Sequence, residues 1–167
     1  MEQSPTESFK VRRAQASDMQ DVCQMIQELA DFEKMSSGPE LSVQDLIRDG
    51  GFEGGQEIFH CFIAELTQMD GSTLKVEPIG YAICYFSFST WQGKSYELQS
   101  LYIREPYTNK GFGKKLFIEI ERNAKAFGCK RINFHVNNSS LARNFYHKMS
   151  ATNLTELEGW QLYRLNL

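Results

Sequence analysis

The sequence lacks the patterns that mark a metal-binding, disulfide-stabilised or membrane-spanning protein. Its four cysteines form no C-x-x-C pair and lie near no histidine cluster, so neither a zinc site nor a disulfide framework is indicated. No stretch approaches the roughly 18 consecutive apolar residues of a membrane helix. The opening residues MEQSPTES are polar, which a signal peptide is not. We therefore expect a cytoplasmic protein that uses no metal and has no membrane partner.

An excess of positive charge is also absent. The chain has 18 lysines and arginines against 21 aspartates and glutamates, which gives a formal net charge of −3. Binding to nucleic acid or to an anionic membrane generally depends on a broad basic surface that releases counterions. The composition therefore argues against a nucleic-acid partner.

The length of the chain is that of one domain. Its 167 residues fall within the range of about 100–200 residues that is usual for a single domain. The sequence contains no internal repeat and no low-complexity tract. We expect a flexible tail over residues 1–8 and a single domain over residues 9–167.

The most informative stretch runs from Leu98 to Phe117 and reads LQSLYIREPYTNKGFGKKLF. Its pattern predicts a strand, a glycine-bearing loop and then a helix. Gly111 and Gly113 remove side chains where the backbone turns, so that several amide N–H groups can converge on one anion. The loop matches neither G-x-x-x-x-G-K-[ST] nor G-x-G-x-x-G, because Leu116 occupies the position of the third glycine of the second pattern.

The helix after this loop has one apolar face, formed by residues at three- and four-residue spacing: Phe112, Leu116, Phe117, Ile120, Ala124 and Phe127. Its first turn would point unpaired N–H groups at the loop, and Lys110, Lys114 and Lys115 add positive charge there. Such a site suits the pyrophosphate of a cofactor. Taken alone, the pattern is explained equally well by a plain turn beside a solvated basic surface.

Periodicity and turn residues predict the other elements. Apolar residues at helical spacing predict helices at Ser17–Phe32, Ser42–Asp49, Phe112–Phe127 and Ser140–Met149. Alternation of apolar and polar residues predicts strands at Phe9–Ala14, Ile58–Leu66, Ile79–Phe88, the stretch that includes Leu98, Arg131–Val136 and Gly159–Leu167. Residues 67–77 are polar and are predicted to be a connection. The order is βααβββαβαβ, which indicates an α/β or α+β fold with a mixed, mostly antiparallel sheet flanked by helices.

This order, with a Gly-x-Gly loop between the central strand and a long helix, resembles the GCN5-related N-acetyltransferase (GNAT) superfamily. Six segments resemble its spermidine/spermine (diamine) and thialysine N-acetyltransferase family, in the same order and at compatible spacing: ELADFEK, FHCFIAE, STWQGK, GFGKKL, ARNFYHK and EGWQLYRL. The resemblance covers nearly the whole chain from Phe9 onward. It implies the GNAT acyl-CoA N-acyltransferase fold and an enzyme that transfers the acetyl group of acetyl-CoA to a primary amine by direct attack in a ternary complex. The implied acceptor is a thialysine- or lysine-like amine, a diamine or a polyamine.

The resemblance also implies how acetyl-CoA would be held. The backbone of the central strand would pair with the pantetheine arm, and the loop amides would hold the pyrophosphate. The residues implied at the cofactor are Leu101, Tyr102, Ile103, Asn109, Lys110, Gly111, Phe112, Gly113, Lys114, Ser139, Ala142 and Tyr146.

Tyr146 occupies the position of the family's general acid, which would protonate the thiolate of the departing coenzyme A. Read from the residues alone, Tyr146 beside Phe145 is an ordinary core aromatic. The family's Glu-Asp pair, which serves amine binding and deprotonation, is replaced here by Gln99 and Ser100. Neither accepts a proton usefully. Glu97 would share a face with Gln99 on a regular strand and is a substitute base, with a solvated carboxylate as the alternative.

The side chains that we expect at the acceptor amine are Phe32, Glu33, Trp91, Gln99, Glu158 and Trp160. The resemblance further implies a homodimer. The missing Glu-Asp pair keeps a second hypothesis open, namely a catalytically impaired acetyl-CoA-binding paralogue that acts as a sensor or interaction protein.

Overall fold

The computed structural model describes residues 7–167, without the side chain of Asp70. Residues 1–6 of the expected tail lie outside the described residues, whereas Glu7 and Ser8 belong to the first strand. The chain divides into two compact units, Met1–His135 and Val136–Leu167. The single domain over residues 9–167 stays a prediction.

The first unit contains one five-stranded sheet in the order β1-β2-β3-β4-β5. The strands are β1 (Glu7–Arg13), β2 (His60–Asp70), β3 (Thr73–Ser89), β4 (Gly93–Ile103) and β5 (Ile132–Phe134). The first three pairings are antiparallel and the β4–β5 pairing is parallel. The mixed, mostly antiparallel sheet is therefore confirmed, and β3 and β4 form an antiparallel hairpin.

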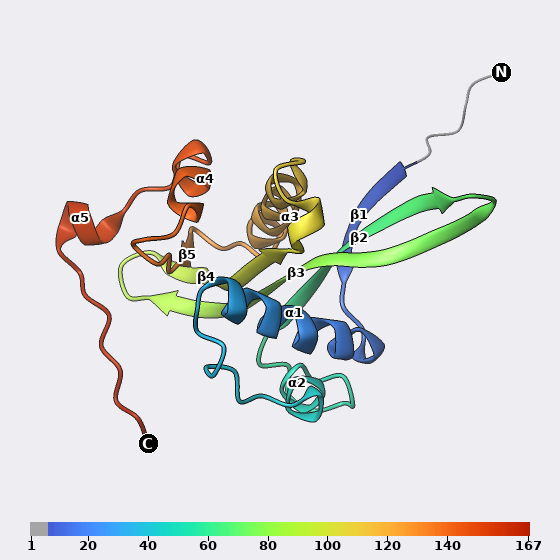
Figure 1. The fold of residues 1–167 in the computed structure, drawn as a ribbon. Coiled ribbons are helices and arrows are strands. Elements are labelled where there is room, and N and C mark those ends of the chain that lie inside the picture. Colours follow the sequence, from blue (N-terminus) through green and yellow to red (C-terminus); the bar gives the residue numbers. More distant parts are fainter. Residues whose placement is uncertain (1–6) are drawn as a thin grey trace. The chain divides into compact units, whose positions relative to one another are not determined.

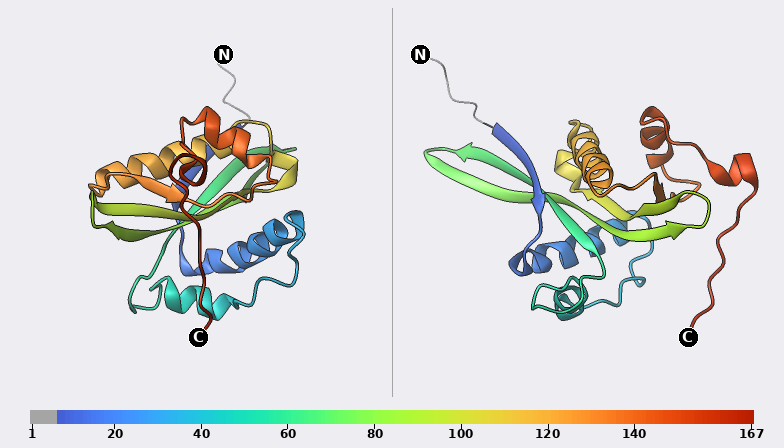
Figure 2. Two further views of the ribbon diagram at one scale, coloured as in Figure 1. Left: turned by 90° about the vertical axis from the view of Figure 1, so that its left-hand side faces the viewer. Right: turned by 180° about the vertical axis from the view of Figure 1, so that it is seen from behind.

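Helices cover both faces of this sheet (Figures 1 and 2). On one face lie α1 (Met19–Phe32), which a short 3₁₀ turn η1 (Ala16–Asp18) precedes, and α2 (Val43–Asp49). On the other face lies α3 (Phe112–Ala126). The core between α1, α2 and the sheet contains fully or almost fully buried Met19, Val22, Met25, Leu46, Ile63 and Tyr81. These positions follow the apolar spacing that predicted the helices.

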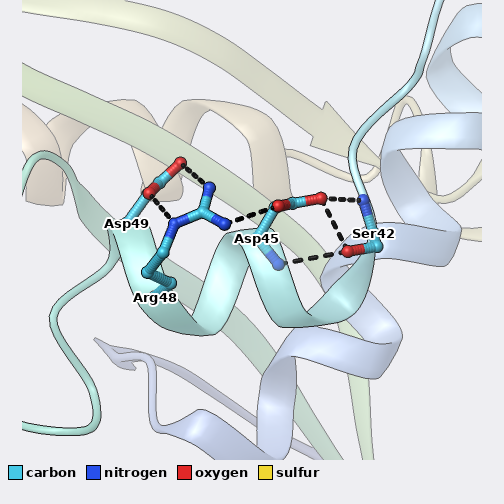
Figure 3. Close-up of polar contacts among 4 residues, drawn as sticks. All are labelled: Ser42, Asp45, Arg48 and Asp49. Atoms are coloured by element: carbon cyan, nitrogen blue, oxygen red, sulfur yellow. Dashed lines mark hydrogen bonds and ion pairs between the residues drawn. The ribbon is translucent and has the colours of Figure 1, made fainter.

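The start of α2 is fixed by a capping box (Figure 3). Ser42 Oγ accepts a hydrogen bond from the Asp45 N–H at 3.2 Å, and the Asp45 carboxylate accepts one from the Ser42 N–H at 2.9 Å. Arg48 then bridges Asp45 and Asp49, both at 2.8 Å. Two N–H groups that a helix start leaves unpaired thus find acceptors, and the predicted start at Ser42 is confirmed.

Residues 67–77 form a two-stranded ribbon, so their prediction as a loop is wrong. Thr67 pairs with Val76 and Met69 with Leu74, and the turn contains Gly71 at φ 62°. The ribbon projects beyond α1 and α2 (Figure 1), and Met69, Leu74 and Val76 are exposed. A ribbon with two solvated faces needs few apolar residues, which explains why its composition resembles that of a loop.

The second unit contains α4 (Ala142–Lys148) and α5 (Leu154–Glu158). The predicted helix at Ser140–Met149 is confirmed, but the strand at Gly159–Leu167 is wrong. No strand is found there in the described chain, and Leu162 and Leu165 are exposed. A β pattern needs a partner strand to supply hydrogen bonds, and alternation in the sequence does not supply one. The sequence analysis also missed α5, whose start Asn153 caps by accepting from the Thr155 N–H at 3.1 Å.

Residues 7–167 contain no helix that is long and apolar enough to cross a membrane. The same residues contain no group of three or more histidine, cysteine or acidic side chains arranged to hold a metal ion.

Candidate active site

The central feature of the first unit is a fork between β4 and β5. The two strands pair only from Tyr96 to Leu98 on β4 and from Ile132 to Phe134 on β5. Within the described residues, Ser100–Ile103 pair with β3 alone. One edge of this half of β4 therefore keeps backbone groups that can hydrogen-bond to a ligand. Leu101, Tyr102 and Ile103, which the sequence placed at the cofactor, form this open edge.

A β-bulge lies where the fork opens. Ile83 of β3 pairs with Ser100 while its neighbour Cys84 pairs with Leu98, so Gln99 is the additional residue on β4. Bulges change the direction of side chains and often occur beside active sites. The regular alternation that we assumed from Glu97 to Gln99 is therefore interrupted. By register, Glu97 lies opposite Tyr85, and Ser100 opposite Ile83, on one face of the sheet.

Glu97 is held in place by neighbours from both adjacent strands. Its Oε1 accepts a hydrogen bond from Ser87 Oγ of β3 at 2.6 Å and another from Asn133 Nδ2 of β5 at 2.7 Å. The pKa of Tyr85 is raised, first by burial and then by the charge of Glu97. The freely solvated carboxylate that was the alternative from sequence is not what the structure has.

The loop after β4 is anchored to its surroundings. Arg104 donates to the carbonyl of Pro78 at 2.9 Å and to Glu28 on α1 at 3.3 Å. Further along, Tyr107 donates its hydroxyl to Glu77 of β3 at 3.0 Å. These contacts hold both ends of the short 3₁₀ turn η2 (Glu105–Tyr107) against the sheet.

The start of α3 has the geometry of an anion-binding turn. Asn109 and Gly111 have left-handed backbone angles, with φ 60° and 84°. Gly111 is the N-cap residue and no side chain caps it, and the Lys115 N–H donates to the Gly111 carbonyl at 3.1 Å. The amides before Lys115 therefore have no acceptor within the helix. They fit the pyrophosphate that the sequence predicted.

Gly113 provides a second sign that this turn receives a ligand. A Cβ built at this position would contact only Ile103 Cγ1, at an ordinary 3.8 Å. The fold therefore leaves room for a side chain, and its absence keeps the helix start open to an approaching phosphate. Lys110 and Lys114 are exposed beside it.

Tyr81 of β3 shares a face of the sheet with Ser100, because Tyr81 and Ile83, which pairs with Ser100, are two residues apart. The pKa of Tyr81 is raised, first by burial; a hydrogen bond with Ser100 opposes this. Glu33 follows α1 as its C-cap residue and is exposed, as is Phe32 at the end of the helix. Sequence reasoning missed Tyr81, because a tyrosine in a buried strand carries no functional signal.

The family comparison agrees with this geometry. The model of the acetyltransferase (GNAT) family matches residues 23–150. The chain belongs to the acetyltransferase (GNAT) family. It shares 35% identity over 158 residues with mouse thialysine N-epsilon-acetyltransferase, which covers 94% of this chain and 92% of that protein. With human spermidine/spermine N(1)-acetyltransferase-like protein 1 it shares 32% over 169 residues, 99% of this chain but 24% of that protein.

Solved structures support the same GNAT fold. The crystal structure of a probable acetyltransferase superposes with a TM-score of 0.71 at 14% identity, over 95% of this chain and 97% of that one. An integron cassette protein from V. cholerae gives a TM-score of 0.69 at 17% identity, over 95% and 93%. At these identities the structures show the fold alone. Together with the relatives, they confirm the family resemblance and establish an N-acetyltransferase.

The remaining expected residues of this GNAT protein lie in the second unit or in turns. Tyr146 is on α4, with its ring 4.9 Å from that of Phe145. Ser139 donates its hydroxyl to Asn137 Oδ1 at 2.8 Å, before Ala142 begins α4. Trp160 Nε1 donates to Glu158 Oε2 at 2.6 Å.

Trp91 lies in the turn between β3 and β4 and is 82% exposed. Its backbone N–H donates to Ser89 Oγ at 3.2 Å, which shapes the turn. Its place at the amine therefore stays a prediction, as do the places of Glu158 and Trp160.

Proposed function

We propose that this acetyltransferase transfers the acetyl group of acetyl-CoA to a primary amine of a small cationic molecule. The observation that carries the proposal is the continuity of the open edge of β4 with the uncapped start of α3, beside the carboxylate of Glu97. The mouse relative named thialysine N-epsilon-acetyltransferase supports an amine acceptor. Acetyl-CoA, when bound, supplies a thioester whose carbonyl carbon is open to nucleophilic attack.

The contacts that we propose to this co-substrate are mainly from backbone. Leu101, Tyr102 and Ile103 offer the open strand edge, and the amides from Asn109 to Lys114 offer donors for phosphate oxygens. Ser139, Ala142 and Tyr146 are proposed contacts from the second unit. Backbone donors tolerate side-chain changes, so the site can bind the cofactor although its sequence departs from the family pattern.

The reaction needs two proton transfers: one to the thiolate of the departing coenzyme A and one from the ammonium form of the acceptor amine. We assign Tyr146 the role of proton donor to the leaving thiolate. Removing a proton from an alkylammonium at pH 7 costs roughly 4–5 kcal/mol. We propose that this proton passes to water or to Glu97, the base that the sequence suggested.

The acceptor that we propose is a small monocationic or zwitterionic amine in preference to a long polyamine. Gln99 and Ser100 replace two carboxylates of the family pattern, which weakens the attraction for a polycation. Proposed contacts to the acceptor are Phe32, Glu33, Trp91, Gln99, Glu158 and Trp160.

We also propose a homodimer that works in the cytoplasm. Exposed Leu162 and Leu165 near the carboxyl end give apolar surface for a second copy. The four cysteines are all free thiols, which suits a reducing compartment. The alternative of an impaired acetyl-CoA-binding paralogue rests on Gln99 and Ser100, and the relatives named as acetyltransferases do not favour it.

The test is acetyl-CoA turnover, followed as free thiol release, with thialysine, lysine, diamines, spermidine and arylalkylamines as acceptors. Tyr146→Phe should lower kcat by about 100-fold or more, as loss of a general acid does. Tyr163→Phe removes the hydroxyl of an exposed tyrosine and should leave kcat unchanged. Tight binding of acetyl-CoA without acetylation of any amine would favour the paralogue.

A further inference from the structure

Three neighbouring strands direct polar side chains to one position on the sheet. Glu97 of β4 lies opposite Tyr85 of β3 and opposite Asn133 of β5. Ser87, two residues beyond Tyr85, points to the same face because side chains alternate along a strand. The hydrogen bonds of 2.6 Å from Ser87 and 2.7 Å from Asn133 confirm that the three side chains meet.

Both of these hydrogen bonds end on the same oxygen of Glu97. Oε1 accepts from the hydroxyl and from the amide, and in the described part of the chain no residue donates to Oε2. A carboxylate oxygen can accept about two hydrogen bonds. The carboxylate is therefore fixed in orientation by one oxygen and keeps its other oxygen for a further donor.

The charge of Glu97 is not neutralised by the fold. Two other partly buried carboxylates of the first unit each meet an arginine: Glu65 pairs with Arg12 at 2.8 Å, and Glu28 pairs with Arg104 at 3.3 Å. Glu97 has no lysine, arginine or histidine nitrogen within 4.0 Å among residues 7–167. The neutral donors keep its side chain in place but leave its negative charge uncompensated. A cation from outside the chain would complete this site.

The carboxylate of Glu97 belongs to the part of β4 next to the fork between β4 and β5. Glu97 is the middle residue of the three that pair with β5, and the strands separate after Leu98. It therefore lies at the closed end of the open edge formed by Ser100–Ile103. Its side chain shares a face with Ser100.

We propose that Glu97 binds the cationic acceptor through Oε2, and that Asn133 and Ser87 are positioning residues that orient its carboxylate. This inference rests on the proposed function and names the group that selects the acceptor. It also gives a reason why the chain can use Gln99 and Ser100 where the family pattern has acids. The negative charge that attracts the amine is supplied two residues earlier and is fixed from the neighbouring strands.

The experiment compares Glu97→Gln with the wild-type protein in steady-state kinetics. Glutamine keeps an oxygen that can accept from Ser87 and Asn133 and removes only the charge. KM for the amine should rise by about 10- to 100-fold, as expected for a lost hydrogen bond to a charged group, while KM for acetyl-CoA changes less than about twofold. Glu53→Gln, at an exposed glutamate in the loop before β2, makes the same change of charge and should have no effect.

The positioning residues Ser87 and Asn133 are tested by removing the group that donates a hydrogen bond to Glu97 and, at Ser87, by restoring it. Ser87→Ala and Asn133→Ala should each raise KM for the amine by a few-fold to about tenfold, and Ser87→Thr should restore the wild-type value because it keeps the hydroxyl. Unchanged thermal melting would show that the variants are folded. An unchanged KM for the amine in Glu97→Gln would overturn the inference and leave the proposed function intact.

Direct binding separates the two proposals. Calorimetric titration with lysine should give an affinity about tenfold or more weaker in Glu97→Gln than in the wild type. If no amine is acetylated, the proposed function fails, and this titration still decides whether Glu97 binds a cation. Equal affinities for the two proteins would overturn the inference.

Discussion

Gly80 on β3 lies directly opposite Ile103 on β4, and a Cβ on Gly80 would come within 2.5 Å of both Ile103 Cδ1 and the Tyr102 carbonyl oxygen. The two strands thus approach closely at the end of the open edge. Gly80→Ala should lower the free energy of unfolding by about 1–3 kcal/mol, because the backbone of β4 opposite Gly80 can shift only at an energetic cost. Urea denaturation measures this loss, and a variant as stable as the wild type would contradict the close approach.

Gly113→Ala makes the same chemical change at another neighbour of Ile103, with a different expected result. The space at Gly113 accepts a Cβ at 3.8 Å from Ile103, and alanine favours a helix by about 0.5–1 kcal/mol over glycine. Stability should therefore be retained or increased. KM for acetyl-CoA should rise by about tenfold, because the new methyl group hinders one charge-assisted hydrogen bond. An unchanged KM would contradict the assignment of this turn to the pyrophosphate.

Arg12 joins β1 to two acidic groups and should be important for stability. It donates to Asp18 at 2.8 and 2.9 Å and to Glu65 at 2.8 Å. Asp18→Asn should destabilise the protein by about 2 kcal/mol, because a mostly buried guanidinium loses one of its two charged partners. Asp49→Asn breaks an exposed pair with Arg48 and should cost less than about 1 kcal/mol. Equal effects of the two changes in urea denaturation would contradict this account of Arg12.

The same ion pair predicts a loss of stability in acid. The hydrogen bond from Arg12 is the main cause that lowers the pKa of Asp18. The folded protein therefore binds this proton less readily than the unfolded chain, whose aspartate has a pKa of about 3.9. The stabilisation is present above that value and is lost as the pH falls through the lower, folded pKa. Asp18→Asn should lack this part of the acid transition in a comparison of unfolding at pH 6 and pH 3.

His60 predicts a second pH dependence, at higher pH. Its Nδ1 lies 2.7 Å from the Tyr96 hydroxyl inside a cluster with Phe86 and Phe127. Burial is the main cause that lowers the pKa of His60 in the folded protein. A histidine in the unfolded chain has a pKa of about 6.5. As the pH falls, the unfolded chain therefore binds a proton at a higher pH than the folded protein does. Stability should be full above about pH 6.5 and fall as the pH drops below it toward the folded pKa.

Urea denaturation at pH 7.5 and pH 5.5 checks the role of His60. The loss between these values should be smaller in His60→Gln than in the wild type. His147→Gln, at an exposed histidine, serves as the control and should follow the wild type. An equal loss in all three proteins would contradict a buried, neutral His60.

The parts of the fold that the sequence predicted are those with a local cause. Helices α1, α2 and α3 follow from apolar spacing, and Ser42, where the second helix was predicted to begin, is the residue that caps α2. The glycine loop before α3 has the left-handed angles that glycine permits at Gly111. At these positions neighbouring residues decide the structure, so no distant contact was needed to predict it.

The features that could not be predicted depend on distant partners. The bulge at Gln99 exists because of the register between β3 and β4, which the sequence of β4 does not specify. The hydrogen bond from Asn133 to Glu97 needs the parallel pairing of β5 with β4, and thirty-six residues separate the two side chains. The prediction of a terminal strand is wrong for the converse reason. Residues 159–167 have alternating apolar and polar residues, but they have no partner strand in the described chain.

The most direct measurement is mass spectrometry of the amine after incubation with acetyl-CoA and the wild-type protein, with thiol release counted in the same sample. We expect one N-acetylated amine, with thialysine as the first acceptor to be tried, for each coenzyme A thiol that is released. Thiol release without an acetylated amine would show hydrolysis. Neither product, with acetyl-CoA bound, would contradict acetyl transfer at the fork between β4 and β5.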